Sequence, residues 1–289
     1  MSAPAAAASL DRVAVIGGGF MGSGIAEALA RAGIDVTVVD VSEQALDAAR
    51  AGISMSLNRA VAGSKLDAAQ AAAALARITT STSMEAARDA DLAIEAAPES
   101  LELKLDIFRR LDELLGPEAI IASNTSSIPI AELASATGRA ERVLGLHFFS
   151  PAAVMKLVEI VVALDTSDQT VATAKAFAER IGKTAIHTKD RSGFVVNMLL
   201  VPYLMAAVRM YEDGFASRED IDTGMKLGCG HPMGPLALCD FIGLDVLYAV
   251  CDSLYEEFKQ PEYAPPPLLK RMVASGRLGR KSGKGFYEY

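Results

Sequence analysis

A histidine and a glutamate occupy matching places in two strand-like runs and form a candidate acid–base pair. Of the three histidines, His187 and His231 lie in segments that we expect at the surface, whereas His147 ends an apolar run. The next strand-like run, 157–162, carries Glu159, and a hairpin would place this residue opposite His147, about 5 Å away at Cβ. A carboxylate at that distance fixes the tautomer of an imidazole and suits a general base. The same spacing also fits a buried pair with a purely structural role.

A glycine-rich loop predicts a dinucleotide site near the amino terminus. The β-branched run 12–16 leads into a G-x-G-x-x-G pattern that opens a helix-like segment, formed by Gly17, Gly18, Gly19, Phe20, Met21 and Gly22. Such a turn lets the backbone approach a pyrophosphate, and the helix directs its amide groups at the phosphates. A second strand-like run ends at Asp40, whose carboxylate can accept hydrogen bonds from a ribose diol and would repel a 2′-phosphate. NAD is therefore favoured over NADP, the alternative being a solvated strand-end carboxylate.

Polar side chains follow another buried strand-like run. Residues 122–127 read Ala-Ser-Asn-Thr-Ser-Ser and include Asn124 and Ser126, at a position where parallel strands deliver side chains to a ligand. They could instead cap the helix-like segment 130–136. Asn197 lies within an otherwise apolar helix, where burial without a partner is costly. It could therefore bind a ligand or another helix.

The order of the expected elements predicts an α/β fold. Strand-like and helix-like segments alternate in the first part of the chain, with strands at 12–16, 35–40, 92–95 and 120–122 and helices at 21–32, 42–62, 65–77 and 101–115. This alternation is typical of parallel βαβ units. After residue 191 the pattern is helical, at 193–211, 217–228, 235–241 and 244–258. We predict a disordered tail (1–10), a Rossmann-type dinucleotide-binding domain (11–189) and a smaller all-α domain (190–289).

Composition restricts the class of protein. The net charge of −8 disfavours nucleic-acid binding, because no basic surplus is available to displace phosphate counterions. Three cysteines without metal-ligand spacing predict reduced thiols in a reducing compartment, the cytoplasm, rather than a disulfide scaffold or a zinc site. The amino terminus lacks the pattern of a secretory signal. The apolar stretch 193–210 contains Asn197, Pro202 and Arg209, which favours a buried helix over a membrane span.

Taken together, these motifs give the chain a family resemblance. From about Arg12 to Tyr289 it resembles the short-chain L-3-hydroxyacyl-CoA dehydrogenases, including bacterial 3-hydroxybutyryl-CoA dehydrogenases. The segments that carry the resemblance are GGGFMGSGIA at 17–26, EAAPESLELK at 95–104, ASNTSS at 122–127, HFFSPAAVMKLVEI at 147–160, GFVVNMLLVPYLMAA at 193–207, KLGCGHPMGPLALCDFIGLD at 226–245 and GRKSGKGFYEY at the end.

The resemblance implies a reaction and a role for each matching residue. His147 would remove the 3-hydroxyl proton of a 3-hydroxyacyl-CoA while hydride leaves for NAD, and Glu159 would orient His147. Ser126 and Asn197 would bind the reacting oxygens of the substrate. The positions implied at the NAD site are Glu99, Lys104, Asn124, Ser126 and Lys281, and Ser56 is implied near CoA. The family also implies a homodimer formed by the helical domain, which agrees with the large apolar surface of residues 193–211.

Two positions depart from the family pattern. Ser150 stands where the family usually has Asn, which shortens the contact that this loop would make to the nicotinamide. Gly63 stands where a lysine near the CoA phosphates is expected, and Arg59 and Lys65 are the nearby cations that could replace it. CoA is a polyanion, so an acidic chain needs a local basic patch to receive it.

Two other functions fit parts of the same pattern. A dehydrogenase of a free 3-hydroxy acid or a sugar acid, such as the gulonate dehydrogenases, would share the dinucleotide-binding half. The segments 147–151 and 232–240 resemble the acyl-CoA enzymes more closely. A non-catalytic NAD-binding protein would need the glycine loop but would not need His147 and Glu159.

Overall fold

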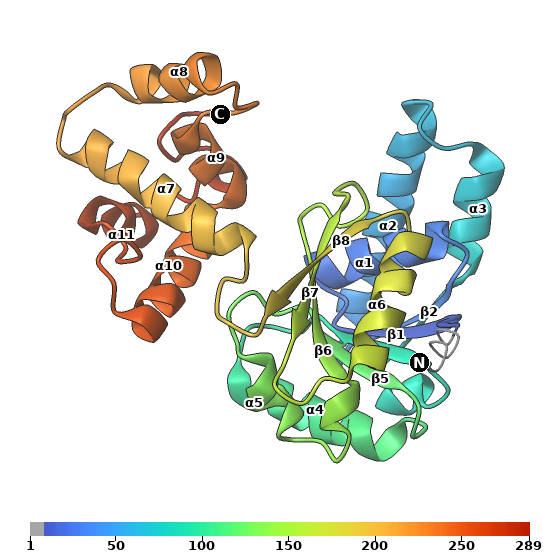
Figure 1. Ribbon diagram of the computed structural model, residues 1–289. Coiled ribbons are helices and arrows are strands. Elements are labelled where there is room, and N and C mark those ends of the chain that lie inside the picture. Colours follow the sequence, from blue (N-terminus) through green and yellow to red (C-terminus); the bar gives the residue numbers. More distant parts are fainter. Residues whose placement is uncertain (1–8) are drawn as a thin grey trace. The chain divides into compact units, whose positions relative to one another are not determined.

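The computed structural model describes residues 9–289, which divide into two compact units between Asp190 and Arg191. Figure 1 shows the first unit as a sheet with helices and the second as helices. Of the expected tail, residues 1–8 lie outside the described residues. Leu10, which we expected in that tail, instead belongs to the core of the first unit and is 5% exposed. Leu10 lies two residues before the start of β1 at Arg12, and its carbonyl accepts a hydrogen bond from Arg180 Nη1 at 3.2 Å.

The first unit is built on an eight-stranded sheet with the order β3-β2-β1-β4-β5-β6-β7-β8. The strands are β1 (Arg12–Ile16), β2 (Asp35–Val39), β3 (Ile78–Ser81), β4 (Leu92–Glu95), β5 (Ile120–Ser123), β6 (Val143–Phe148), β7 (Leu157–Val162) and β8 (Thr184–Lys189). Strands β1 to β6 are parallel, β7 is antiparallel to β6, and β8 is parallel to β7. The strand order reverses between β1 and β4, which is the place where such sheets bind ligands.

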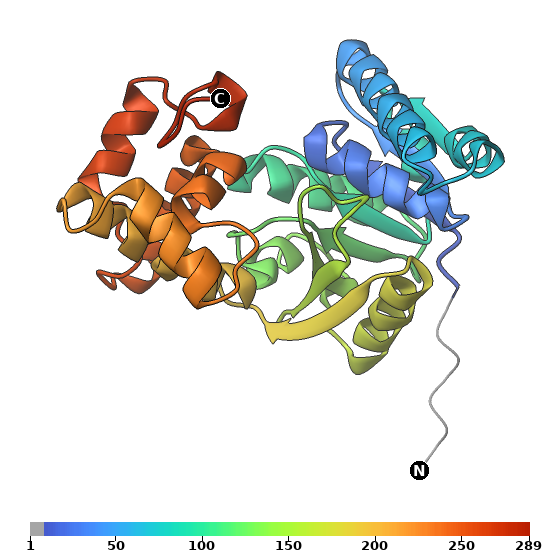
Figure 2. The same cartoon turned by 90° about the horizontal axis from the view of Figure 1, so that it is seen from above.

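Helices cover both faces of this sheet (Figure 2). They are α1 (Phe20–Arg31), α2 (Glu43–Ala62), α3 (Ala68–Ala76), α4 (Leu101–Leu114), α5 (Ile130–Ala134) and α6 (Asp168–Arg180). Apolar residues of α1, α2 and α6 pack with one face of the strands, among them Ile25, Ile53 and Phe177. Helix α5 lies against the other face, where a Cβ at Gly145 would come within 3.1 Å of Ile130 Cδ1. The predicted Rossmann-type α/β class of this domain is confirmed.

Two strands and one α-helix of the first unit have no counterpart among the predicted elements. Strands β3 and β8 lie at the two edges of the sheet and have mostly polar sequences, ITTS and TAIHTK. An edge strand that is partly exposed carries no continuous apolar run, so its pattern resembles that of a loop. Helix α6 connects β7 to β8 and is capped by Ser167, whose hydroxyl accepts a hydrogen bond from the Thr170 amide.

The second unit is helical, as predicted, and has its own core. Its helices are α7 (Val196–Glu212), α8 (Arg218–Gly228), α9 (Pro235–Ile242), α10 (Leu244–Phe258) and α11 (Pro267–Ala274). Helix α7 begins at Val196 rather than at Gly193, because Gly193 and Phe194 have φ angles of +80° and +49°, outside the helical region. Within residues 9–289 no helix combines the length and the apolar character that crossing a membrane requires.

Candidate functional site

The glycine loop between β1 and α1 has the shape of a phosphate cradle. Gly17 has a φ of +110°, and a Cβ there would lie 2.6 Å from the carbonyl oxygen of Ala96. A Cβ at Gly22 would overlap the carbonyl oxygen of Gly17, so the loop itself requires both glycines. A Cβ at Gly19 would meet no atom within 4 Å. The chain therefore does not need glycine at 19 for its own packing, whereas a pyrophosphate lying on the loop would need it.

Asp40 holds this loop from the end of β2. Its Oδ2 accepts a hydrogen bond from the Gly18 amide at 2.8 Å, and its Oδ1 accepts one from the Ser42 amide at 3.1 Å. Phe20 is 72% exposed at the start of α1, whereas Met21 is half-buried and packs against the core. The carboxylate is thus fixed beside the glycine loop, where it can accept a ribose diol and disfavours a 2′-phosphate.

His147 and Glu159 form a buried pair on the hairpin of β6 and β7. The two residues are paired in register, as the sequence predicts. His147 Nδ1 lies 2.7 Å from Glu159 Oε2, and the histidine is 7% exposed while the glutamate is fully buried. Because a carboxylate only accepts, Nδ1 carries the proton, and the lone pair of the neutral ring is on Nε2. The Phe149 ring packs on the imidazole at 4.7 Å between centroids. This arrangement fits a histidine that takes up a proton.

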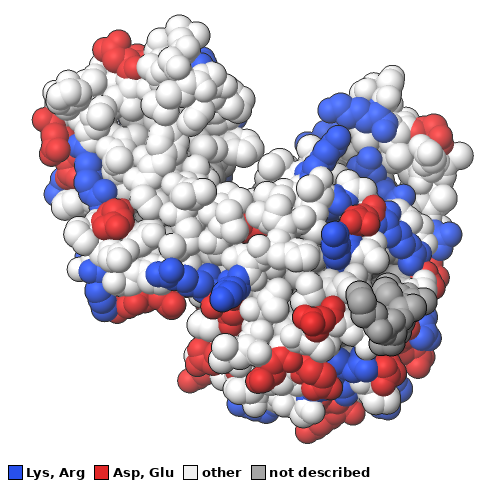
Figure 3. Space-filling model, in the orientation of Figure 1, with Lys and Arg blue, Asp and Glu red and all other residues white. Residues whose placement is uncertain are grey.

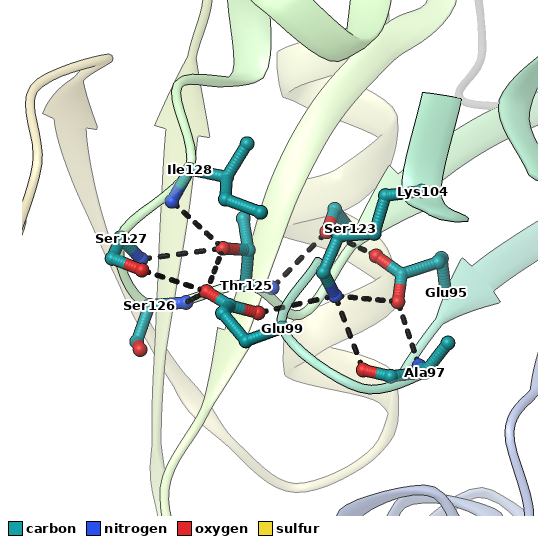
Figure 4. Close-up of polar contacts among 9 residues, drawn as sticks. All are labelled: Glu95, Ala97, Glu99, Lys104, Ser123, Thr125, Ser126, Ser127 and Ile128. Carbon is teal, nitrogen blue, oxygen red and sulfur yellow. Dashed lines mark hydrogen bonds and ion pairs between the residues drawn. The ribbon is translucent and has the colours of Figure 1, made fainter. Parts of the chain in front are cut away.

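A buried lysine lies beneath the loops that follow β4 and β5 (Figure 4). Lys104 is 1% exposed, and its ammonium lies 2.6 Å from Glu95 Oε1 and 3.2 Å from Glu99 Oε2. Glu95 also accepts hydrogen bonds from the Ala97 amide and the Ser123 hydroxyl, both at 2.6 Å. These partners compensate a buried charge that would otherwise be costly. Lys104 therefore positions the loops, and a direct contact of this residue with NAD stays a prediction.

Glu99 organises the polar segment that follows β5. It accepts hydrogen bonds from the Ser127 hydroxyl at 2.8 Å and the Ser126 amide at 3.3 Å, and it also binds the Thr125 hydroxyl. Burial alone would raise the pKa of the Glu99 carboxyl, but the Lys104 ammonium and two hydroxyl donors lower it below its usual value. Figure 4 shows the Ser126 hydroxyl directed away from the other residues drawn. Ser126 is thus held by its backbone, while its hydroxyl points elsewhere.

Two further contacts define this edge of the sheet. Asn124 Oδ1 accepts a hydrogen bond from the Phe148 amide at 2.9 Å, which links the end of β5 to the end of β6. Asp190 accepts hydrogen bonds from the amides of Ile130 and Ala131 at 2.9 and 2.7 Å. Asp190 therefore caps α5, and the alternative that residues 122–127 do so is wrong. Glu95 and Ser123 belong to the network but were not among the predicted site residues, although a glutamate ending the apolar run LAIE is a signal for it.

Sequence comparison assigns both units to one family. Residues 12–191 match the family model of the 3-hydroxyacyl-CoA dehydrogenase NAD binding domain, and residues 193–289 match that of the 3-hydroxyacyl-CoA dehydrogenase C-terminal domain. The chain belongs to the 3-hydroxyacyl-CoA dehydrogenase family. It is therefore an NAD-dependent oxidoreductase acting on a CH–OH group, which excludes the non-catalytic alternative.

Similar proteins match along nearly their whole length. A 3-hydroxybutyryl-CoA dehydrogenase of Mycobacterium tuberculosis is 50% identical over 283 residues, which cover 97% of this chain and 99% of that protein. The crystal structure of M. tuberculosis FadB2 has a TM-score of 0.96 at 50% identity and covers 98% of this chain and all of that one. The (S)-3-hydroxybutyryl-CoA dehydrogenase PaaH1 from Ralstonia eutropha has a TM-score of 0.92 at 48% identity, with coverages of 97% and 99%.

The remaining predicted site residues of the first unit lie at or near its surface. Ser56 is half-buried on α2, and Lys65 is exposed in the turn between α2 and α3. Arg59 is exposed in the last turn of α2, and Gly63 is the C-cap residue of that helix. Ser150 is exposed in the loop that follows β6. Their proposed contacts with CoA or NAD stay predictions.

In the helical unit, Asn197 is half-buried in the first turn of α7. The Lys281 ammonium contacts the carboxylate oxygens of Asp245 at 2.6 Å, so an approach of Lys281 to the cofactor stays a prediction. His231 is half-buried rather than at the surface, because its Nδ1 lies 3.1 Å from the Tyr203 hydroxyl. His187 on β8 is exposed, as predicted.

Proposed function

We propose that the enzyme interconverts (S)-3-hydroxybutyryl-CoA and acetoacetyl-CoA with His147 as general base. The observation that carries the assignment of the base is the buried 2.7 Å contact between His147 Nδ1 and Glu159 Oε2. The substrate is supported by the relatives of similar length that are named for 3-hydroxybutyryl-CoA. The reaction balances as (S)-3-hydroxybutyryl-CoA and NAD giving acetoacetyl-CoA, NADH and a proton.

In the oxidation, His147 accepts the proton of the 3-hydroxyl group at Nε2. The glycine loop and Asp40 would hold NAD, which would supply the acceptor for the hydride from C3 of the substrate. Glu159 keeps the ring in the tautomer with its proton on Nδ1 and stabilises the imidazolium that forms. This stabilisation arises only when the ring becomes charged, so it lowers the barrier of the chemical step more than it tightens substrate binding.

Ser126 and Asn197 complete the proposed assignment. The Ser126 hydroxyl, which points away from the Glu99 network, is available as a donor to a substrate oxygen. Asn197 places a side-chain amide in the otherwise apolar first turns of α7. We assign it to the reacting oxygen of the substrate because the family resemblance implies that role. Replacing either residue by alanine should lower kcat/KM for acetoacetyl-CoA, and Asn197→Ala should leave NADH binding unchanged.

The reaction is tested by NADH oxidation with acetoacetyl-CoA, with free acetoacetate and with NADPH as controls. We expect rapid turnover that requires the CoA thioester and NADH. His147→Gln should keep NADH affinity and lower turnover on the order of a hundredfold or more. Turnover of the free acid alone would move the assignment to a hydroxy-acid dehydrogenase, and near-normal turnover of the variant would remove His147 from the mechanism.

The helical unit also supports a homodimer as part of this proposal. Its exposed apolar side chains include Leu199, Phe215 and Leu227, which are 73%, 80% and 81% exposed. Large apolar groups exposed on one unit are typical of surfaces that another protein covers. Sedimentation at micromolar concentration should show a species with twice the mass of one chain, and a monomer alone would contradict the dimer.

A further inference from the structure

The network around Lys104 contains two carboxylates and only one cation. The Lys104 ammonium lies between the carboxylates of Glu95, at 2.6 Å, and Glu99, at 3.2 Å (Figure 4). Amide, hydroxyl and ammonium groups donate hydrogen bonds to both glutamate side chains, which is the bonding expected of ionised carboxylates. Among residues 9–289 neither carboxylate has a second cation within ion-pair distance. The network therefore carries one net negative charge.

This charged network lies between the glycine loop and the histidine that accepts the proton. Directly after Glu95, the Ala96 amide donates a hydrogen bond at 2.7 Å to the carbonyl of the last residue of β1, where the glycine loop begins. On the other side, the Asn124 amide donates to the Glu95 carbonyl at 2.8 Å. The Asn124 side chain accepts from the amide of Phe148, the neighbour of His147. A cofactor with its pyrophosphate on the glycine loop and its nicotinamide near His147 would pass beside the network.

The net charge of the network is held where salt screens it little. Glu95 is fully buried and Lys104 is 1% exposed, whereas the Glu99 side chain is 40% exposed and brings the charge to the edge of the network. Figure 3 shows surface charges of both signs intermixed on the lower part of the first unit. Exposed charges are screened by salt, and buried charges much less so. The network therefore acts on a ligand beside it more strongly than the exposed charges do.

We propose that Glu95 makes the cofactor site select the oxidised form of the nicotinamide. The ring of NAD carries a positive charge and that of NADH is neutral, whereas the rest of the cofactor is the same in both. A net negative charge beside the ring attracts only the oxidised form. Glu95 acts through the network without contacting the cofactor, because its charge leaves Lys104 unable to neutralise Glu99 completely. By linkage, a site that binds NAD more tightly than NADH favours hydride transfer from NADH to a carbonyl substrate.

Cofactor binding is measured by titration calorimetry on the enzyme without substrate, in separate titrations with NAD and with NADH. Glu95→Gln removes one negative charge from the network and nearly preserves the size of the side chain. We expect the Kd of NAD to rise relative to that of NADH on the order of tenfold, the effect of one unit charge at an effective dielectric constant of about 20. Glu113→Gln is the matched control, because it makes the same chemical change at an exposed position near the end of α4. Its ratio of Kd values should equal that of the wild type.

Glu99→Gln is the second variant and decides the question if Glu95→Gln does not fold. It removes the same charge from a partly exposed side chain and leaves Lys104 paired with Glu95, so it should shift the ratio of Kd values in the same direction. A merely structural role of Glu95 would weaken both cofactors equally. The inference is overturned if the ratio of a folded variant stays within about twofold of the wild type, or if Glu113→Gln shifts it equally. Because no substrate is present, the outcome is independent of the reaction proposed above.

Discussion

Replacing Glu159 by glutamine isolates the charge of the carboxylate from its shape. Glutamine has nearly the same size and can still accept a hydrogen bond from His147 Nδ1 through its amide oxygen. Because Glu159 is fully buried and His147 is 7% exposed, water cannot take over the role of the lost charge. The variant therefore removes the stabilisation of the imidazolium while leaving the hairpin of β6 and β7 in place.

The size of the effect follows from the geometry of the pair. The contact of 2.7 Å is a charge-assisted hydrogen bond once the ring is protonated, and bonds to charged groups contribute at least about 1.5 kcal/mol. An upper value of about 4 kcal/mol is the interaction of two unit charges 4 Å apart at an effective dielectric constant of about 20. A factor of ten in rate corresponds to about 1.4 kcal/mol. We therefore expect kcat for alcohol oxidation to fall by about tenfold to about a thousandfold.

The assay is steady-state formation of NADH from (S)-3-hydroxybutyryl-CoA, together with NADH binding followed by fluorescence. A primary isotope effect with deuterium at C3 shows whether hydride transfer limits the rate. The control is Glu179→Gln, because Glu179 is exposed on α6 and makes the same chemical change away from His147. The reasoning is refuted if Glu159→Gln binds NADH normally, shows the isotope effect of the wild type and retains kcat within twofold.

Three further outcomes follow from the structure. Gly19→Ala should weaken NADH binding without lowering Tm, because a Cβ at position 19 meets no protein atom within 4 Å. Gly22→Ala should lower Tm, because a Cβ at position 22 overlaps a backbone carbonyl oxygen. Equal Tm values for the two variants would contradict this contrast. A disulfide reagent at pH 8 should react with one thiol in the native protein, the exposed Cys229, and with three thiols after denaturation. The other two cysteines are buried, and burial raises the pKa of Cys251 to about 12. Two or more rapidly reacting thiols in the native protein would refute this prediction. Asp240→Asn should lower the free energy of unfolding by about 1–3 kcal/mol in denaturant titrations. The reason is that the buried carboxylate accepts hydrogen bonds from two amides and one hydroxyl of the carboxyl-terminal segment. An unchanged denaturation midpoint would show that other contacts hold this segment.

The elements predicted from sequence were those whose apolar residues repeat with a clear period or fill a buried strand. Strands β1 and β4 have the predicted bounds, because their side chains are buried except for Arg12 and their sequences are apolar between the charged ends at Arg12 and Glu95. The edge strands β3 and β8 have no such pattern, since their partial exposure permits threonine, serine and histidine. The start of α7 depended on two residues in the left-handed region, which apolar periodicity cannot reveal.

The sequence by itself determined the order of the elements, the glycine loop and the register that pairs His147 with Glu159, because each depends on spacing within a short stretch of chain. Only the tertiary structure decided which groups compensate the buried charges. Glu95, Lys104 and Ser123 come from β4, α4 and β5, and Asp190 reaches α5 from sixty residues away in sequence. Such contacts form where segments that are distant in sequence meet. A buried charge needs a partner that is close in space, and sequence spacing does not show which residue that is.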